Sequence, residues 1–175
     1  MVHADASNFG SNVSKHEAYD QVLEQARSLF CSQRNWVCNA ANAASLLWHA
    51  LRALPPPSCD VNWAGFYVRD RSHPARLILG PFQGKVACQS ILWGRGVCGA
   101  AAASRRTQLV PDVSKFPGHI ACDANTQSEV VVPILHQDEV VAIIDIDCAA
   151  KDGFDEDDQK FLEELANILA NACDW

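Results

Sequence analysis

Apolar residues recur at helical spacing at both ends of the chain and in strand-like runs between them, and this order constrains the fold most. Residues 15–30 and about 34–53 predict two N-terminal helices. A third helix is predicted after Asp155, whose side chain can cap it, with Asp158 three residues further on. Strands are expected between these helices at residues 61–69, 76–79, 107–110, 129–135 and 140–147.

Helices before and after a run of strands favour an α+β fold. We expect a central antiparallel sheet with the N- and C-terminal helices on one face and a ligand pocket on the other. The glycine-rich residues 80–99 predict a long ordered loop or short strands, and a short helix is expected at residues 97–104. Residues 15–175 are expected to form one domain, and the polar residues 1–14 a flexible tail without a signal peptide.

Charge and hydropathy argue against two classes of partner. The net charge of −7 repels phosphate backbones, and no basic stripe with interleaved aromatics offsets it, so we expect no nucleic acid. No apolar run approaches the roughly 20 residues that a membrane helix needs. The sequence therefore indicates a protein that engages neither nucleic acid nor membrane.

Eight cysteines are many for 175 residues. The large apolar fraction and the expected lack of an export signal favour reactive thiols in a reducing, cytoplasmic compartment over a disulfide framework. No C-x2-C pair occurs, which argues against a structural zinc site, and we expect no metal or other cofactor. Five cysteines are interpreted as structural or incidental, of which only Cys148 adjoins other candidate residues: Cys31, Cys38, Cys59, Cys148 and Cys173.

Two aspartates end the apolar run of the strand at residues 140–147. Asp145 and Asp147 are two residues apart, so both side chains leave the same face of that strand. Neighbouring carboxylates resist ionising together, which raises one pKa toward values useful for a general acid. Glu129 can share this face only if the hairpin contains an odd loop or a β-bulge, because a regular ladder with a two-residue turn would point it away. We therefore predict such an irregularity.

Six segments of the sequence, by their order and spacing, resemble those of a known protein family. They are N-W-A-G-F-Y from Asn62, L-G-P-F-Q-G-K-V-A-C from Leu79, G-R-G-V-C-G from Gly94, D-V-S-K-F-P-G-H-I-A-C-D from Asp112, S-E at Ser128 and D-I-D from Asp145. Together they closely resemble the GAF-domain free methionine-R-sulfoxide reductases. The resemblance implies reduction of the R epimer of free methionine sulfoxide in a closed pocket, recycling by a thioredoxin-like reductant, and a homodimer.

The same resemblance implies roles for particular residues. Its C-x9-C-x23-C spacing matches Cys88, Cys98 and Cys122. Cys122 takes the role of nucleophile, Cys88 is the first candidate to close a disulfide with it, and Cys98 is an alternative or a relay. The substrate-binding residues of the family match Trp63, Tyr67, Glu129, Asp145 and Asp147.

The chemistry of sulfoxide reduction fits these residue types. A thiolate attacks the sulfoxide sulfur and becomes a sulfenic acid, and a second thiol condenses with it to a disulfide. An acid must protonate the departing oxygen, and carboxylates can also hold the ammonium of a free amino acid. Pattern alone slightly favours Cys98 as nucleophile, because it opens a predicted helix whose N–H dipoles would lower its pKa. The resemblance favours Cys122, which we follow.

The rival from another class is a non-catalytic GAF domain that senses a ligand or a redox signal. The acidic cluster would repel a phosphate-bearing ligand such as a cyclic nucleotide. The sequence therefore favours an enzyme over a sensor.

Overall fold

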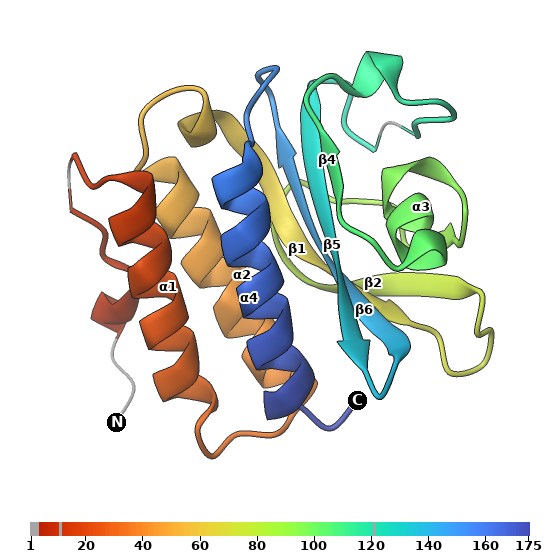
Figure 1. Cartoon of the computed structure of the whole chain (residues 1–175), viewed down its shortest axis with the longest axis horizontal. Helices are drawn as coiled ribbons and strands as arrows, with labels where there is room; N and C mark the ends of the chain where they lie inside the picture. The colour runs from red at the N-terminus through yellow and green to blue at the C-terminus, as the bar shows by residue number, and fades with distance from the viewer. Residues whose placement is uncertain (1–3, 11, 121) are drawn as a thin grey trace.

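Six strands and four α-helices form across the described residues, in the order expected for an α+β protein (Figure 1). The structure is a computed structural model and describes residues 4–10, 12–120 and 122–175. The helices are α1 (Lys15–Phe30), α2 (Trp36–Arg52), α3 (Gly96–Ser104) and α4 (Glu156–Ala172). The strands are β1 (Val61–Arg69), β2 (Arg76–Gly84), β3 (Ser90–Leu92), β4 (Gln108–Val110), β5 (Ser128–His136) and β6 (Glu139–Cys148).

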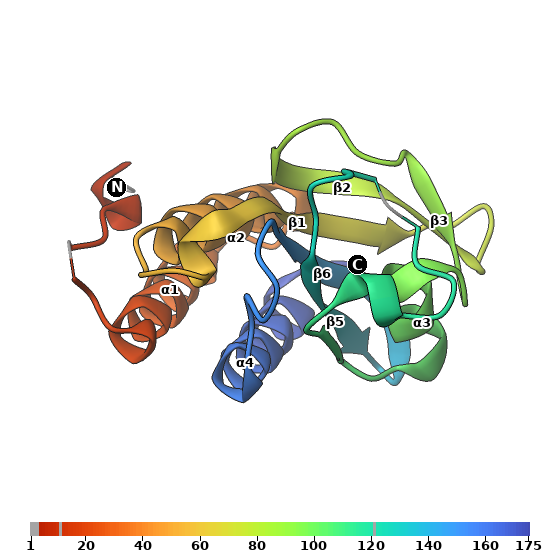
Figure 2. The same ribbon diagram turned by 90° about the horizontal axis from the view of Figure 1, so that it is seen from above.

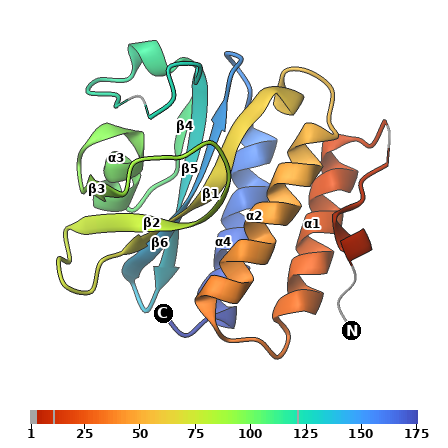
Figure 3. The same cartoon turned by 180° about the vertical axis from the view of Figure 1, so that it is seen from behind.

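The strands form one antiparallel sheet in the order β3-β2-β1-β6-β5-β4. Helices α1, α2 and α4 lie together on one side of it, as seen from above in Figure 2 and from behind in Figure 3. Helix α3 and the central loops lie on the opposite side. Each face of the sheet has its own apolar core, one shared with the three long helices and one with α3. This arrangement confirms the predicted layers.

Two capping boxes set where the outer helices begin. The Ser14 side chain accepts from the Glu17 backbone N–H at the start of α1, and the Glu17 carboxylate accepts from the Ser14 N–H in return. Asp155 and Asp158 form the same reciprocal pair at α4, as the sequence predicted. The buried Asp158 also accepts from the Tyr19 hydroxyl at 2.8 Å, which ties α1 to α4.

The N-terminal segment has structure that the polar composition did not indicate. Ala4–Ser7 form a short 3-10 helix, and Phe9 and Val13 pack against the core beneath the long helices. The Asn8 carbonyl accepts from the Gln21 side chain at 3.0 Å. These contacts anchor the described part of the segment on α1 and its neighbours.

Strand β2 extends beyond the predicted residues 76–79 to Gly84. Between the pairs Gly65–Phe82 and Tyr67–Leu79 the register shifts, so Gly80 and Pro81 together lie opposite Phe66. This is a β-bulge, a place where a strand tolerates proline because the ladder hydrogen bond is already lost. Residues 80–99 were expected to form a long ordered loop or short strands, and the structure has strand here in the end of β2 and in three-residue β3.

None of the helices in the described ranges combines the length and the apolar character needed to cross a membrane.

Candidate active site

The three acids predicted for the pocket lie side by side on neighbouring strands. Glu129 on β5 pairs with Asp147 on β6, and Asp145 lies two residues along β6 on the same face. Trp63 on β1 lies opposite Asp147 on the other side of β6. With Tyr67, also on β1, these residues line a cavity of about 240 Å³ beneath α3 and the central loops. The structure thus brings together all five residues predicted to bind substrate.

A bulge in the β5–β6 hairpin places Glu129 in this cavity. The turn has two central residues, Gln137 and Asp138, both with positive φ, as in the tight turns that match strand twist. A regular ladder from such a turn would point Glu129 to the opposite face. Instead the register shifts between the pairs Ile134–Ala142 and Leu135–Val140, which leaves Val141 as an extra residue on β6. The predicted irregularity is confirmed.

Burial keeps protons on the acids of the cavity. It is the main cause that raises the pKa of Asp145 to about 6. Burial raises the pKa of Glu129 well above its ordinary value, and the charges of Asp145 and Asp147 raise it further. The pKa of Asp147 is raised in the same way, by burial and then by Asp145. A cluster of this kind holds at least one proton near neutral pH and can donate it.

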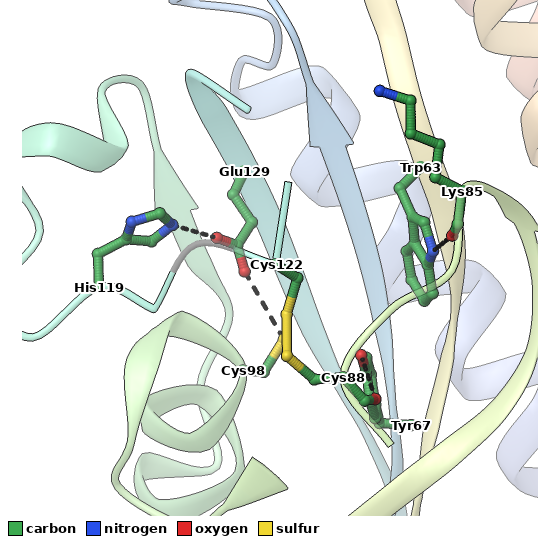
Figure 4. Close-up of a disulfide and its surroundings, with 8 residues drawn as sticks. All are labelled: Trp63, Tyr67, Lys85, Cys88, Cys98, His119, Cys122 and Glu129. Atoms are coloured by element: carbon green, nitrogen blue, oxygen red, sulfur yellow. Dashed lines mark hydrogen bonds and ion pairs between the residues drawn. A yellow bond between two sulfur atoms is a disulfide. The ribbon is translucent and has the colours of Figure 1, made fainter. Parts of the chain in front are cut away.

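Two of the three motif cysteines form a disulfide over the cavity (Figure 4). Cys88, from the loop between β2 and β3, is bonded to Cys122, from the loop that precedes β5, with Cα atoms 6.1 Å apart. The resemblance had named this pair first. The loop that carries Cys88 is held from below, because the Tyr67 hydroxyl donates to the Cys88 carbonyl at 3.0 Å and the Trp63 indole donates to the Lys85 carbonyl at 3.2 Å.

Cys98 is a buried free thiol near the start of α3. Its sulfur donates to Oε1 of Glu129 at 3.6 Å. The helix start was predicted, but the expected lowering of the thiol pKa was wrong. Burial and the neighbouring charges of Asp145 and Glu129 raise the pKa of Cys98 well above its ordinary value, and they outweigh the helix N-terminus. Cys98 is therefore a protonated hydrogen-bond donor rather than a thiolate.

Cys98 and two of the acids are also close enough together to hold a cation. Ligand atoms of Cys98, Glu129 and Asp145 all lie within 4.8 Å of one another. Within the described ranges Oδ1 of Asp145 is buried and has no hydrogen-bond partner, so it is available to a bound ligand. A thiol and two carboxylates at this spacing could bind a divalent metal or an ammonium group. The sequence had predicted no metal here.

Further polar residues line the cavity that sequence reasoning did not select, among them Asn62, Lys85, His119 and Asp123. Nε2 of His119 lies 3.7 Å from Oε2 of Glu129, and burial lowers the pKa of the imidazole. The Lys85 ammonium and the Asn62 amide both donate to Oδ2 of Asp123, at 3.1 and 3.4 Å. All four lie inside the motif segments, which was the signal available. His119 had been interpreted as a hydrogen-bonding loop residue.

Cys148 lies away from this chemistry. It is buried in the core on the helical face of the sheet, and its thiol donates to the Pro57 carbonyl at 3.4 Å. Its position next to Asp147 in the sequence therefore brings it no closer to the cavity, because neighbours on a strand point to opposite faces.

Fold and site together define a small α+β domain with a disulfide-bonded cysteine pair over an acidic pocket. A family model described as "GAF domain" matches residues 40–174. A solved structure described as a GAF domain superposes with a TM-score of 0.95 at 52% identity, covering 100% of this chain and 98% of that one.

Two named relatives are more specific. A protein of Saccharomyces cerevisiae named free methionine-R-sulfoxide reductase is 54% identical over 172 residues, 98% of this chain and 94% of the relative. A free methionine-R-sulfoxide reductase from Neisseria meningitidis, solved in complex with its substrate, is 38% identical with a TM-score of 0.84, covering 94% and 93% of the two chains. The chain belongs to the GAF-domain free methionine-R-sulfoxide reductases, a family of enzymes.

Proposed function

We propose that this chain reduces free L-methionine-(R)-sulfoxide to L-methionine, with Cys122 as nucleophile and Cys88 as the thiol that closes the disulfide. The observation that carries the proposal is the Cys88–Cys122 disulfide above a cavity that contains three carboxyl groups with raised pKa values. The names of the relatives supply the substrate, and the cavity is of a size for a small molecule.

The acids suit a free amino acid. The ammonium of methionine sulfoxide can donate to Oδ1 of Asp145, which has no hydrogen-bond partner among the described residues. The negative charge of the cluster also attracts the ammonium. Methionine within a peptide has no ammonium to offer and would have to enter a cavity that two loops cover. Trp63, stacked on Phe82 at 5.3 Å between ring centroids, offers an apolar surface for the terminal methyl group.

The first step transfers oxygen from substrate to enzyme. The Cys122 thiolate attacks the sulfoxide sulfur while an acid of the cluster protonates the sulfoxide oxygen. The sulfur–oxygen bond then breaks, methionine leaves, and Cys122 holds the oxygen as a sulfenic acid. Glu129 is the acid we assign, because its pKa is raised both by burial and by two neighbouring charges.

The second step closes the disulfide and releases water. The Cys88 thiol attacks the sulfenic sulfur of Cys122, and the hydroxyl leaves as water with the thiol proton. Cys98, as a protonated donor to Glu129, keeps the acid network ordered, and it remains the alternative partner of Cys122.

A thioredoxin-like dithiol donor returns the enzyme to its reduced form by thiol–disulfide exchange. The six other cysteines, all within the described ranges, are free, which supports work in a reducing compartment such as the cytoplasm. We also infer that the enzyme works as a homodimer, as the family resemblance implies.

The direct test is incubation of the protein with the separated R and S epimers of free methionine sulfoxide and dithiothreitol, followed by quantification of methionine. We expect methionine from the R epimer and at least 100-fold less from the S epimer. Cys122→Ser should form none in a single turnover, and Cys38→Ser, at an exposed cysteine on α2, should match the native protein. Ligand binding without methionine formation would contradict the proposal and favour a non-catalytic GAF sensor.

A further inference from the structure

Large apolar side chains are exposed around the mouth of the cavity. Val86 is 91% exposed, Leu92 58% and Ile120 49%, and all three border the cavity that lies beneath the disulfide. They are half of the large apolar side chains that are exposed in the described part of the chain. Single exposed aliphatic residues are common on soluble proteins, but a gathering at one mouth indicates a contact surface. We call Val86, Leu92 and Ile120 the rim patch.

Two residues of the rim patch lie close to the disulfide in the sequence as well as in space. Val86 precedes Cys88 by two residues, and Ile120 precedes Cys122 by two. Ile120 lies against the start of α3, where a Cβ added to Gly96 would be 3.6 Å from its side chain. An exposed aliphatic residue thus accompanies each half of the cystine.

The two cysteines differ in accessibility. Cys122 is exposed, whereas Cys88 is half-buried and its carbonyl is held by the Tyr67 hydroxyl. Thiol–disulfide exchange requires a thiolate to approach one sulfur with the other as leaving group, so access selects the sulfur that is attacked. The exposed half of this disulfide is Cys122.

We propose that the rim patch is the docking surface for a protein dithiol donor, and that the donor attacks Sγ of Cys122. This inference rests on the proposed function. The fitting partner presents a reactive thiol surrounded by an apolar surface of its own, because three aliphatic side chains gain nothing from a small hydrophilic thiol. An apolar contact at the rim holds the donor sulfur over the exposed half of the cystine.

The exchange balances in two steps. The donor thiolate bonds to Cys122 Sγ, the Cys88–Cys122 bond breaks, and Cys88 leaves as a thiolate that takes up a proton. The second donor thiol then loses its proton and attacks the donor sulfur of the mixed disulfide, which frees the Cys122 thiolate. The donor departs as a disulfide, and this chain has gained two electrons.

The kinetic test compares a protein donor with a small one. Val86→Asp and Ile120→Asp are each expected to lower kcat/KM for bacterial thioredoxin at least 10-fold, while turnover with dithiothreitol stays within twofold of the native value. Val37→Asp is the matched control, since Val37 is 46% exposed on α2 on the other side of the sheet. Its kcat/KM for thioredoxin should not change.

The outcomes separate this inference from the proposed function. Unchanged thioredoxin kinetics in both rim variants, or an equal fall in Val37→Asp, would overturn the docking surface while leaving the reductase intact. No methionine with dithiothreitol in the native protein would instead reject the proposed function.

The attacked sulfur is tested by trapping. A thioredoxin whose second active-site cysteine is replaced by serine stalls at the mixed disulfide, which mass mapping then locates. We expect the cross-link on Cys122 and at least a fivefold lower yield in Val86→Asp. A cross-link mainly on Cys88 would contradict the proposed direction of attack.

Discussion

Glu129 on β5 lies directly opposite Asp147 on β6, although the hairpin between the two strands turns over only two residues. The bulge at Val141 makes this pairing possible, so one extra residue far from the cavity decides which face of β5 carries its acid. Burial raises the pKa of both carboxyl groups, and the charge of Asp147 raises the pKa of Glu129 further.

Replacing Asp147 with asparagine should therefore change the pH dependence of the enzyme. If protonated Glu129 is the general acid, kcat/KM falls as pH rises through its pKa. Loss of the Asp147 charge lowers that pKa, so in Asp147→Asn the fall should begin at lower pH. The pH profile of kcat/KM measures this shift, with Asp152→Asn, exposed and outside the cavity, as control. A shift to higher pH would contradict the assignment.

Asp145 should reduce stability at neutral pH. Its pKa of about 6 in the folded protein lies above the ordinary 3.8. The free energy of unfolding therefore has its full contribution from protonated Asp145 below pH 3.8, and this contribution is lost as pH rises through about 6. Asp145→Asn should match the native protein at pH 4 and exceed it by up to about 3 kcal/mol at pH 7. Urea unfolding at both pH values tests this, and an equal difference at both would contradict it.

The acids should make the enzyme require a free amino group. N-acetylation of methionine sulfoxide removes the ammonium and leaves buried carboxylates without a partner. We expect kcat/KM for the N-acetyl substrate to be lower by roughly 10³-fold or more. A methyl ester, which changes only the carboxylate end, is the matched substrate control. Equal rates for the acetylated and free substrates would show that the acids do not bind the substrate ammonium.

Much of this fold could be predicted from the apolar pattern, because each element has a periodic face and clear ends. Helix α1 and strand β1 occupy the residues that were predicted, and the cap at Asp155 fixed the start of α4. Strand β2 could not be predicted in full, because Gly80 and Pro81 are typical of a loop. Only their place opposite Phe66, at a bulge, shows why a strand accepts them.

The site was predictable in its membership but less so in its electrostatics. The spacing of Asp145 and Asp147 puts them on one face, and the resemblance supplied the three cysteines. The pKa of Cys98 depends on Glu129 and Asp145, which are distant in sequence. A helix-start argument could not include these charges, and it gave the wrong direction.

Gly65 on β1 leaves no room for a side chain between Phe82 and the Trp63 ring. A Cβ at this position would be 2.3 Å from Cβ of Phe82 and 2.7 Å from the Trp63 ring. Gly65→Ala should destabilise the fold by about 1–3 kcal/mol through overpacking and should raise KM for the substrate. Gly10→Ala, where nothing lies within 4 Å, is the control in urea unfolding and steady-state assays. If Gly65→Ala is as stable as the native protein, β1 and β2 can move apart here at no cost, which would contradict the expected overpacking.

The central claim is that Cys122 takes the oxygen and Cys88 closes the bond. One equivalent of free methionine-(R)-sulfoxide is added to reduced protein, the reaction is quenched with an alkylating reagent, and disulfides are mapped by mass spectrometry. The account predicts one methionine per chain with a Cys88–Cys122 disulfide, and a sulfenic acid on Cys122 in Cys88→Ser. Sulfenic acid on Cys98, with Cys122 alkylated as a free thiol, would contradict it.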